Sequence, residues 1–427
     1  MSLADNLDTR CHKSSLIGQA VQGRYHVESL ICKGTFGDLY KVVDIESFSL
    51  VGKRIRRAMK VIDVRAKPRI SPRNYTNHQL AQARREIDYH LLVSSHPNIV
   101  TLHEWFHDSS REEMVLILDY CAGGDLQTYI TKDSGNPFAE DDRQMKQIIL
   151  QICDAVDFIH SKGVFHKDIK PQNILISPDG WKVFLCDFGL ATDMRTDCRG
   201  EGTKSYMSPE LLQEQGFYCP QRADVWALGV TILDMLGICL WNSATIHSIG
   251  FLKFMLVDDY LVCALSRSIS AKANDLIRDI LRFHPELRLS IPEISARVLQ
   301  LPSFFEHQRA SFSAAELQEL ASLYQCTLTR IDPIARRRRE LEDFRRMVKN
   351  LAFNDLTGRT PYPPICTPGD PHSNSSQHHY GVPRLHCGPI SGFPAQVEIL
   401  SEQRAAVLKH WRNVFGMSVA GYKQYYF

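Results

Sequence analysis

Apolar and polar residues alternate near the start of the chain in a pattern typical of β-strands. The segment from Tyr25 to about Lys41 reads as strand, glycine-containing turn and strand, and the segment from Ala58 to Val64 reads as a further strand. The basic stretch from Lys53 to Arg57 predicts an exposed loop before that strand. Apolar residues then recur at spacings of three and four, which is the period of a helix with one buried face. This predicted face consists of Leu80, Ala83, Ile87 and Leu91.

Helical periodicity dominates the next part of the chain, up to about Phe305. A second long helix has its predicted buried face at Ile148, Ile149, Ile152, Val156 and Ile159. We therefore predict an α+β fold class with a bilobal arrangement. A small β-rich lobe that carries one key helix is followed by a larger, mainly helical lobe.

Four further segments flank this part of the chain. Residues 1–23 are polar without a clear period, and we interpret them as a flexible leader. Residues 307–352 are predicted to form a helical extension, because Ser313 to Glu316 has the pattern of a capping box and Asp332-Pro333 that of a helix start. Residues 353–395 are rich in Pro, Gly, Ser and His, which favours a disordered linker. Residues 396–427 are expected to hold a last helix, about Ser401 to Phe415, and a tail.

The predicted extension contains a longer amphipathic helix. Its apolar face consists of Leu341, Phe344, Val348 and Leu351. This face suggests that the C-terminal helices dock on the main domain or on a regulator. The basic run from Arg336 to Arg339 could be a nuclear-import or nucleic-acid patch. The acidic residues that follow it favour a solvated helix face instead.

Composition and charge narrow the class of protein. The 427 residues carry 50 basic and 48 acidic side chains, a formal net charge of +2, so we expect neither nucleic acid nor an anionic membrane as a partner. The twelve cysteines form no C-x-x-C pair and no zinc-type spacing. The first ten residues lack the apolar core of a secretory signal, and no apolar stretch is long enough to span a bilayer. A cytoplasmic or nuclear location is expected.

Phosphoryl transfer requires residue types that this chain presents in order. It needs a cation for the phosphates, hard oxygen ligands for magnesium and a carboxylate that orients the attacking hydroxyl. Gly34 and Gly37 lie in the turn of the first hairpin, although glycines at this spacing occur in many ordinary turns. Lys60 lies on the following strand and Glu86 on the next helix, where they can pair. Taken alone, such a pair could equally be a solvated surface contact.

Two motifs give these residues a context. His166 to Asn173 (HKDIKPQN) follows the second long helix, and Asp187-Phe-Gly189 follows a predicted strand from Lys182 to Leu185. With these motifs the chain resembles the eukaryotic protein-kinase family from Tyr25 to about Phe305, which predicts a catalytic domain over residues 24–306. Further matching segments are His96 to Asn98, Ser208 to Glu210, Asp224 to Gly229 and Pro285 to Arg288.

The resemblance implies catalytic roles for particular residues. Asp168 would accept or orient the proton of the incoming hydroxyl, and Lys170 would neutralise the transferring phosphoryl group. Asn173 would act with them and, together with Asp187, would supply oxygen ligands to Mg²⁺. Lys60 would hold the α- and β-phosphates of ATP. The implied cofactors are therefore ATP and Mg²⁺, and the implied partners are protein substrates.

The resemblance also implies a nucleotide pocket. Leu118 would be the gatekeeper, the segment from Asp119 to Cys121 the hinge that binds adenine through its backbone, and Asp125 a ligand of the ribose. The whole implied set is Ile31, Gly34, Gly37, Leu39, Ala58, Lys60, Glu86, Leu118, Asp119, Cys121, Asp125 and Asp187. Glu210 and Arg288 would form a buried ion pair with a structural role.

The chain departs from the family pattern at several positions. Cys32 replaces the first glycine of the phosphate loop, Leu39 replaces the usual valine, and Lys167 replaces the usual arginine before the catalytic aspartate. That arginine normally grips a phosphate on the activation loop with a planar fork, which lysine cannot reproduce. The position that relatives phosphorylate holds Arg199, which suggests that activity does not depend on phosphorylation there.

Three further expectations concern specificity, regulation and reactivity. Thr192 or Thr196 could carry the activating phosphate instead. Lys170 together with Thr203 is the serine/threonine pattern of the family, while Gln172 argues against a strong preference for basic substrates. The cysteines at the pocket, Cys32 and Cys121, are either inert packing residues or reactive thiols, and Cys186 is expected to be core.

The sequence therefore predicts an ATP-dependent serine/threonine protein kinase. Three segments are similar to fungal kinases of nutrient and meiotic control: Arg85 to His90, Val93 to Pro97 and Tyr206 to Glu210. One alternative is a pseudokinase or scaffold that binds nucleotide without catalysis, which Cys32 and Lys167 favour. Another is a kinase of small molecules, against which Ser208 to Glu210 and Gly202-Thr203 argue.

Overall fold

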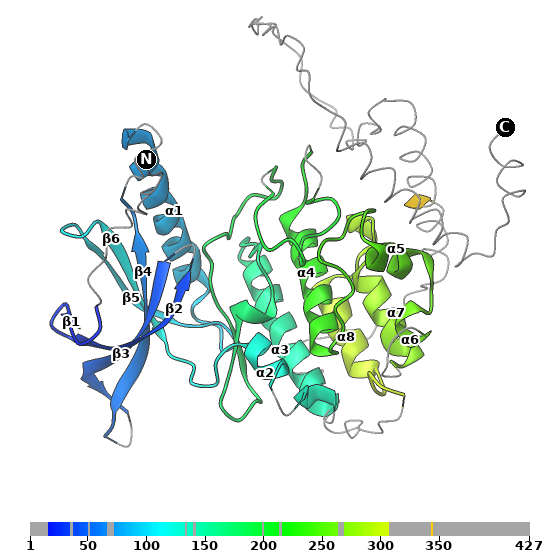
Figure 1. Cartoon of the computed structure of the whole chain (residues 1–427), viewed down its shortest axis with the longest axis horizontal. Helices are drawn as coiled ribbons and strands as arrows, with labels where there is room; N and C mark the ends of the chain where they lie inside the picture. The colour runs from blue at the N-terminus through cyan, green and yellow to red at the C-terminus, as the bar shows by residue number, and fades with distance from the viewer. Residues whose placement is uncertain are drawn as a thin grey trace, which may run out of the picture. The chain divides into compact units, whose positions relative to one another are not determined.

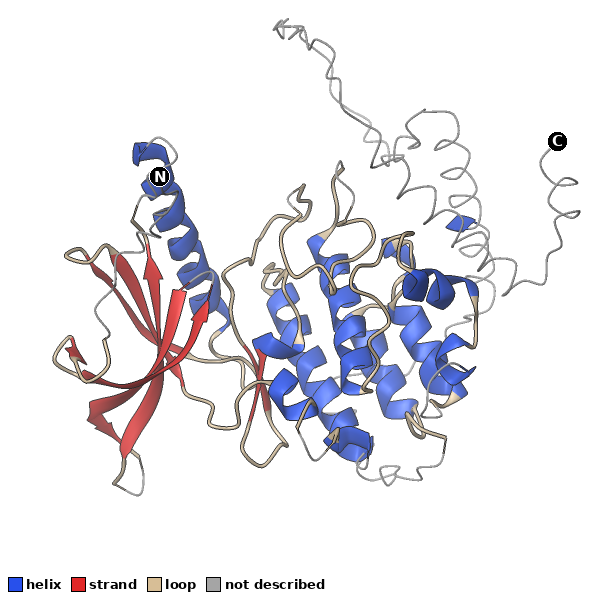
Figure 2. Ribbon diagram, in the orientation of Figure 1, coloured by secondary structure: helices blue, strands red, loops and turns tan. Residues whose placement is uncertain are grey.

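The computed structural model describes residues 16–34, 37–49, 52–65, 72–132, 135–139, 142–198, 200–212, 216–263, 269–306 and 343–344. These residues form a β-rich N-terminal lobe and a mainly helical lobe, as predicted (Figure 1, Figure 2). Arg199 and most of the expected extension, linker and C-terminal helix lie outside the described residues.

The N-terminal lobe is an antiparallel sheet with one long helix. Its six described strands lie in the order β1-β2-β3-β4-β6-β5. Their bounds are β1 Ala20–Val21, β2 Tyr25–Gly34, β3 Gly37–Phe48, β4 Arg54–Asp63, β5 Leu102–Asp108 and β6 Glu113–Asp119. Helix α1, Pro72–Val93, lies along one face of the sheet (Figure 1).

The two faces of the sheet have separate apolar cores. Successive side chains of a strand point to opposite faces. On β4, Met59 and Val61 therefore pack with Tyr25, Val42 and neighbouring residues on one face. Ala58 packs on the other face, in a cluster that also contains Ala83 and Ile87 of α1. Lys60 shares the face of Ala58, so the alternation turns its ammonium group toward α1.

Two local predictions for this lobe were wrong. Strand β4 begins at Arg54 and not at Ala58, because the basic residues pair with β3 and Arg57 also pairs with Asp119 of β6. On α1 the buried residue of the fourth turn is His90, while Leu91 is 46% exposed. Ala83 and Ile87 are buried as predicted, but the buried face continues three residues later at His90 and not four residues later at Leu91, since a polar imidazole with a hydrogen-bond partner occupies the inner face.

Residues 16–23 are part of the folded lobe, in contrast to the expected leader. Leu16 is buried, and β1 pairs with β2 through Ala20 opposite His26 and Val21 opposite Tyr25. This segment lies over the sheet face that carries Met59. Residues 1–15 lie outside the described part of the chain.

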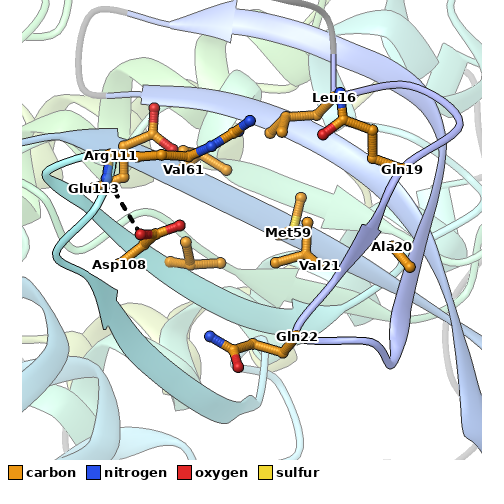
Figure 3. Close-up of a pocket in the computed structure, with 11 residues that line it drawn as sticks. Leu16, Gln19, Ala20, Val21, Gln22, Met59, Val61, Asp108, Arg111 and Glu113 are labelled. Carbon is orange, nitrogen blue, oxygen red and sulfur yellow. Dashed lines mark hydrogen bonds between the residues drawn. The ribbon is translucent and has the colours of Figure 1, made fainter.

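A small cavity lies between this N-terminal segment and the hairpin of β5 and β6 (Figure 3). It has a volume of about 180 Å³, and its apolar lining includes Leu16, Met59, Val61 and Val115. Because Met59 and Val61 point away from Lys60, this cavity lies on the opposite face of the sheet from that lysine.

The second lobe is built around two buried helices. Helix α3, Asp142–Ser161, buries all five isoleucine and valine positions predicted for it, and α4, Pro220–Met235, is buried on nearly every side. The other helices are α2 Leu126–Ile130, α5 Ile249–Leu256, α6 Tyr260–Cys263, α7 Ala271–Ile280 and α8 Ile291–Gln300. Short 3-10 turns occur at η1 Pro137–Ala139, η2 Pro171–Asn173 and η3 Pro285–Leu287, and a two-stranded ladder joins β7 Ile174–Ile176 to β8 Val183–Leu185.

Both described residues of the predicted extension contact this lobe, and Asp343 Oδ2 lies 3.9 Å from His284 Nε2. The side chain of Phe344 is fully buried, with its ring centroid 6.2 Å from that of Phe251 on α5 and 5.1 Å from that of Phe283. Among the described helices, none has the length and apolar character needed to cross a membrane.

Candidate active site

A lysine between two carboxylates forms the centre of the site. Lys60 on β4 donates to Glu86 of α1 at 2.5 Å and to Asp187, which follows β8, at 2.7 Å. Burial would lower the pKa of Lys60, but the charges of Glu86 and Asp187 outweigh burial and raise it. Burial likewise works against ionised Asp187, but Lys60 lowers the pKa of Asp187 to about 2. The geometry therefore favours the ionised form of both residues.

The backbone around Asp187 positions its carboxylate. Asp187 has a φ of 66°, in the left-handed region that side chains other than glycine rarely adopt. Phe188, the next residue, is buried between two imidazoles, 4.9 Å from His90 and 5.1 Å from His166. With the phenyl ring inserted there, the neighbouring carboxylate faces Lys60.

The Asp168 carboxylate accepts four hydrogen bonds from three residues. Its Oδ2 accepts from Lys170 Nζ at 2.6 Å and from Asn173 Nδ2 at 3.0 Å. Its Oδ1 accepts from the backbone N–H and the hydroxyl of Thr203, at 3.1 and 2.9 Å. Lys170 also donates to the Thr203 hydroxyl at 2.8 Å. The predicted catalytic residues are therefore brought into direct contact.

A buried carboxylate of α4 binds the backbone of the loop that carries Asp168. Asp224 of α4 accepts from the backbone N–H of His166 and of Lys167, each at 2.8 Å, and contacts His160 Nε2 at 2.9 Å. Lys167 has a φ of 68°. The fixed amides stabilise this unusual backbone conformation, which presents Asp168 to the site.

The predicted nucleotide pocket is assembled from both lobes. Leu39, Ala58 and Leu118 belong to one apolar cluster with Leu175 and Cys186 of the second lobe. Ala58 lies opposite Leu118 in the β4–β6 ladder. The cluster provides apolar surfaces above and below a flat ring, and Leu175 is a member that the sequence analysis missed. Its position two residues after Asn173 could have suggested it.

The backbone N–H of Cys121 in the hinge is available as a donor. In the described part of the chain the N–H of Cys121 has no hydrogen-bond partner, while its carbonyl accepts from Gly124. The Asp119 carboxylate accepts from Arg57 at 2.8 Å and contacts His103 at 2.6 Å, so that side chain is engaged away from the hinge backbone. Asp125 caps α2 by accepting from the N–H and hydroxyl of Thr128.

The glycines of the β2–β3 hairpin allow the hairpin to pack closely on β4 as well as allowing a ligand to approach the backbone. Gly37 has a φ of 146°, and a Cβ atom there would lie 2.5 Å from the carbonyl oxygen of Val61. Any other residue would therefore push the hairpin away from β4. Gly34 pairs directly with Gly37, and Ile31 on β2 is half-exposed.

The residues present fit ATP and a divalent cation. Asn173 uses its Nδ2 for two bonds to Asp168, which leaves its amide oxygen for a cation. Asp187 lies next to it, because the Cys186 N–H donates to the Asn173 carbonyl at 3.0 Å. One amide and one carboxylate oxygen suit Mg²⁺, which takes its other ligands from phosphate and water.

The two cysteines predicted at the pocket have raised pKa values. Burial raises the pKa of Cys121 to about 11, and burial together with Asp187 raises the pKa of Cys32. Both environments disfavour the thiolate. Cys186 packs partly into the apolar cluster, its thiol contacts the Asn173 carbonyl, and burial raises its pKa as well.

Lys167 lies deep in the second lobe. Its Nζ donates to Asp197 Oδ2 at 2.7 Å and to Glu201 Oε2 at 3.1 Å. The sequence analysis named Lys167 but neither of its partners. Farther away, Arg288 makes the predicted ion pair with Glu210 as a fork, with two N–O distances of 2.6 Å.

Comparison with known proteins identifies the family of this chain. The family model described as "Protein kinase domain" matches residues 25–299, well over half of the chain. The chain therefore belongs to the protein-kinase family.

Individual relatives come from fungi and plants. The chain is 29% identical to "Negative regulator of sexual conjugation and meiosis" of Schizosaccharomyces pombe, over 66% of this chain and 61% of that protein. It is 34% identical to "Serine/threonine-protein kinase KSP1" of Saccharomyces cerevisiae, over 41% of this chain and 16% of that protein. It is 33% identical to "CBL-interacting protein kinase 8" of Oryza sativa subsp. japonica, over 64% of this chain and 56% of that protein. The chain thus spans less than two thirds of the length of these curated relatives.

Proposed function

We propose that this chain is a catalytically active protein kinase that transfers the γ-phosphoryl group of ATP to serine or threonine hydroxyls of proteins. The observation that carries the proposal is a set of contacts made at the same time. Lys60 is paired with Glu86 and Asp187, while Asp168 is bonded to Lys170 and Asn173. Positioning and charge neutralisation are most of what phosphoryl transfer asks of a protein.

Each residue has a role that its contacts support. Asp168 orients the acceptor hydroxyl and takes its proton, because a neutral alcohol needs a nearby carboxylate to become a nucleophile. Lys170 places a positive charge 2.6 Å from that carboxylate, where the transferred phosphoryl group carries negative charge. Lys60 holds the α- and β-phosphates, and Glu86 keeps its ammonium group in place.

ATP and Mg²⁺ are the proposed cofactors. Asp187 and Asn173 would hold the cation, which when bound neutralises phosphate charge. The adenine ring would lie between Leu39, Ala58 and Leu175, with the free N–H of Cys121 as its donor. Ile31, Gly34 and Gly37 would cover it, Leu118 would limit its depth, and Asp125 would meet the ribose.

Serine/threonine specificity is supported by the pair of Lys170 and Thr203. Both side chains contact Asp168 and each other, so that Thr203 is part of the wall next to the acceptor position. Relatives named serine/threonine kinases share the family, and the similarity to the fission-yeast meiotic regulator supports a role in signalling. The seven cysteines whose side chains the structure describes are free thiols, which supports a reducing compartment, cytoplasmic or nuclear.

The proposal is tested by transfer of labelled phosphate from ATP with magnesium to casein and myelin basic protein. We expect Asp168→Ala to lower the rate about 100- to 10,000-fold, the contribution typical of a general base. Glu286→Gln, at an exposed residue far along the chain from the site, is the matched control and should retain the wild-type rate. Wild-type protein that is folded and binds ATP but transfers no phosphate would favour the scaffold alternative.

A further inference from the structure

Lys167 is a buried cation that only the next part of the chain neutralises. Its side chain is 1% exposed, and its two ion-pair partners among the described residues are Asp197 and Glu201. Both carboxylates belong to the activation loop, defined here as Asp187 to Glu210. The Lys167 ammonium group therefore ties the loop that carries Asp168 to the activation loop.

Burial and several hydrogen bonds fix the position of Asp197. Its side chain is 3% exposed, its Oδ1 accepts from the N–H of Cys198, and its backbone exchanges two hydrogen bonds with Tyr218, at 3.0 and 2.9 Å. Glu201 is more open, with a side chain that is 40% exposed. The primary partner of Lys167 is thus the buried aspartate, and the glutamate is a secondary one.

The contact continues to the catalytic carboxylate. Gly202 follows Glu201 with a φ of 124°, and a Cβ atom there would lie 2.9 Å from the Lys167 carbonyl oxygen. The next residue, Thr203, donates twice to Asp168. Residues 201–203 therefore run against the Lys167–Asp168 backbone, and the position of Thr203 depends on the segment that Lys167 holds.

The positive charge of Lys167 is compensated by carboxylates of the chain itself. A buried ammonium group is costly unless a carboxylate compensates it, and removal of one partner leaves the other charge unpaired. Here the chain itself provides both negative charges, so no added phosphate is needed to complete the pair. Lysine suits this task, because a compact ammonium group pairs with single carboxylate oxygens without the planar fork that a phosphate rewards.

We propose that Asp197 and Glu201 form an acidic clamp on Lys167 that holds the activation loop in its catalytic arrangement without phosphorylation. The inference concerns the regulation of the proposed kinase site and rests on that proposed function. It replaces a phosphate-dependent switch with a contact that forms when the chain folds.

The first test uses the full chain after phosphatase treatment, with intact mass confirming that no phosphate remains. We expect the dephosphorylated protein to retain at least half of its transfer rate onto casein. A preparation that is active when phosphorylated and loses more than tenfold on dephosphorylation would overturn the clamp while leaving the kinase proposal standing. A preparation that is inactive in both states would instead contradict the proposed function itself.

The second test neutralises the clamp. Asp197→Asn keeps the shape but leaves Lys167 with only the partly exposed Glu201 as an ion-pair partner, and we expect a loss of tenfold or more in kcat together with faster proteolytic cleavage between residues 187 and 210. The KM for ATP should change less than twofold, because the Lys60 pair is not part of the clamp. Glu201→Gln should lose two- to fivefold, and the exposed Glu286→Gln should lose nothing.

Folding controls keep the result decisive. If Asp197→Asn does not fold, Glu201→Gln is the test instead, because Glu201 is partly exposed. Its thermal unfolding midpoint is measured together with its transfer rate. Wild-type kcat and wild-type protease resistance in a folded Asp197→Asn protein would overturn the proposal.

Discussion

The imidazole ring of His90 lies 4.9 Å from the ring of Phe188, and its Nε2 contacts the carbonyl oxygen of Val100 at 2.6 Å. His90 thus joins α1 to the residue after Asp187 and to the segment just before β5. Glu86 lies one helical turn earlier on the same face of α1. His90 is therefore a positioning residue for the pair that Glu86 makes with Lys60.

Burial of His90 predicts a pH-dependent stability. Burial lowers its pKa to about 4, below the ordinary value of 6.5, so the folded protein keeps this ring neutral where the unfolded chain binds a proton. Between about pH 6.5 and pH 4 this group should lower the free energy of unfolding by about 1.4 kcal/mol per pH unit as the pH falls. Urea unfolding at pH 7, 6 and 5 measures the effect.

The matched variants separate His90 from other titrating groups. His90→Leu should flatten the pH dependence, while substitution of the exposed His26 by Gln should leave the wild-type slope. Equal slopes for wild type and His90→Leu would show that the ring does not carry the linkage.

Removal of the central cation should affect activity and stability together. Lys60→Met deletes the group that holds the phosphates, and we expect a loss of about 100-fold or more in kcat/KM. It also leaves the buried Glu86 carboxylate and the partly exposed Asp187 carboxylate without a cation, which should lower the free energy of unfolding by about 3–5 kcal/mol. The double variant Lys60→Met with Glu86→Gln should regain part of the stability and none of the activity. A single variant with wild-type unfolding would contradict the role of the buried pair.

Linear motifs made the core of the site predictable from sequence. Asp168, Lys170 and Asn173 are bound to one another within a few residues, and Lys60 and Glu86 lie on elements whose periods place them face to face. Such residues depend on local geometry that the sequence encodes directly.

Contacts between distant segments were not predictable in this way. Asp197 lies thirty positions from Lys167, and no period or motif links them. His90 was hidden because its buried imidazole breaks the apolar pattern, so the neighbouring Leu91 was assigned to the inner face. The early start of β4 depended on pairing with β3 and β6, which overrides the polar character of its arginines.

The ion pair of Glu210 and Arg288 should be a major source of stability in the second lobe. The Arg288 side chain is fully buried, and its fork to Glu210 is complemented by bonds to the carbonyl groups of Arg222 and Arg282. Arg288→Met should cost about 3–5 kcal/mol in free energy of unfolding, since it strands the carboxylate. Arg288→Lys should recover less than half, because an ammonium group cannot make the fork. If urea unfolding shows that Arg288→Lys has the wild-type free energy of unfolding, the fork to Glu210 is not the source of the stability.

Alkylation of Cys121 should be slow at neutral pH. With a pKa of about 11, about one thiol in a thousand is ionised at pH 8, and the thiolate is the reactive form. We expect the iodoacetamide labelling rate of Cys121, followed by peptide mass spectrometry, to rise about tenfold from pH 8 to pH 9. Rapid labelling at pH 7 that ATP blocks would reveal an activated thiol and refute the prediction.

Phe344 should anchor the residues after the kinase domain to the second lobe. Its ring meets Phe251 and Phe283 edge to face, with interplanar angles of 86° and 66°, an arrangement that adds to the effect of apolar burial. Phe344→Ala would leave a hole next to α5, because Phe251 is itself fixed by Trp226 and Trp241 and cannot collapse into the space.

The expected cost of Phe344→Ala is therefore about 3–5 kcal/mol in free energy of unfolding. Ile249→Ala, at a half-exposed residue of α5, is the control and should cost under about 0.5 kcal/mol. Because α5 lies outside the proposed catalytic contacts, Phe344→Ala protein that is still folded should transfer phosphate at the wild-type rate. Equal stability of the two variants would mean that the ring does not bind the lobe in solution. A rate that changes while stability does not would instead make Phe344 part of a regulatory contact with the kinase domain.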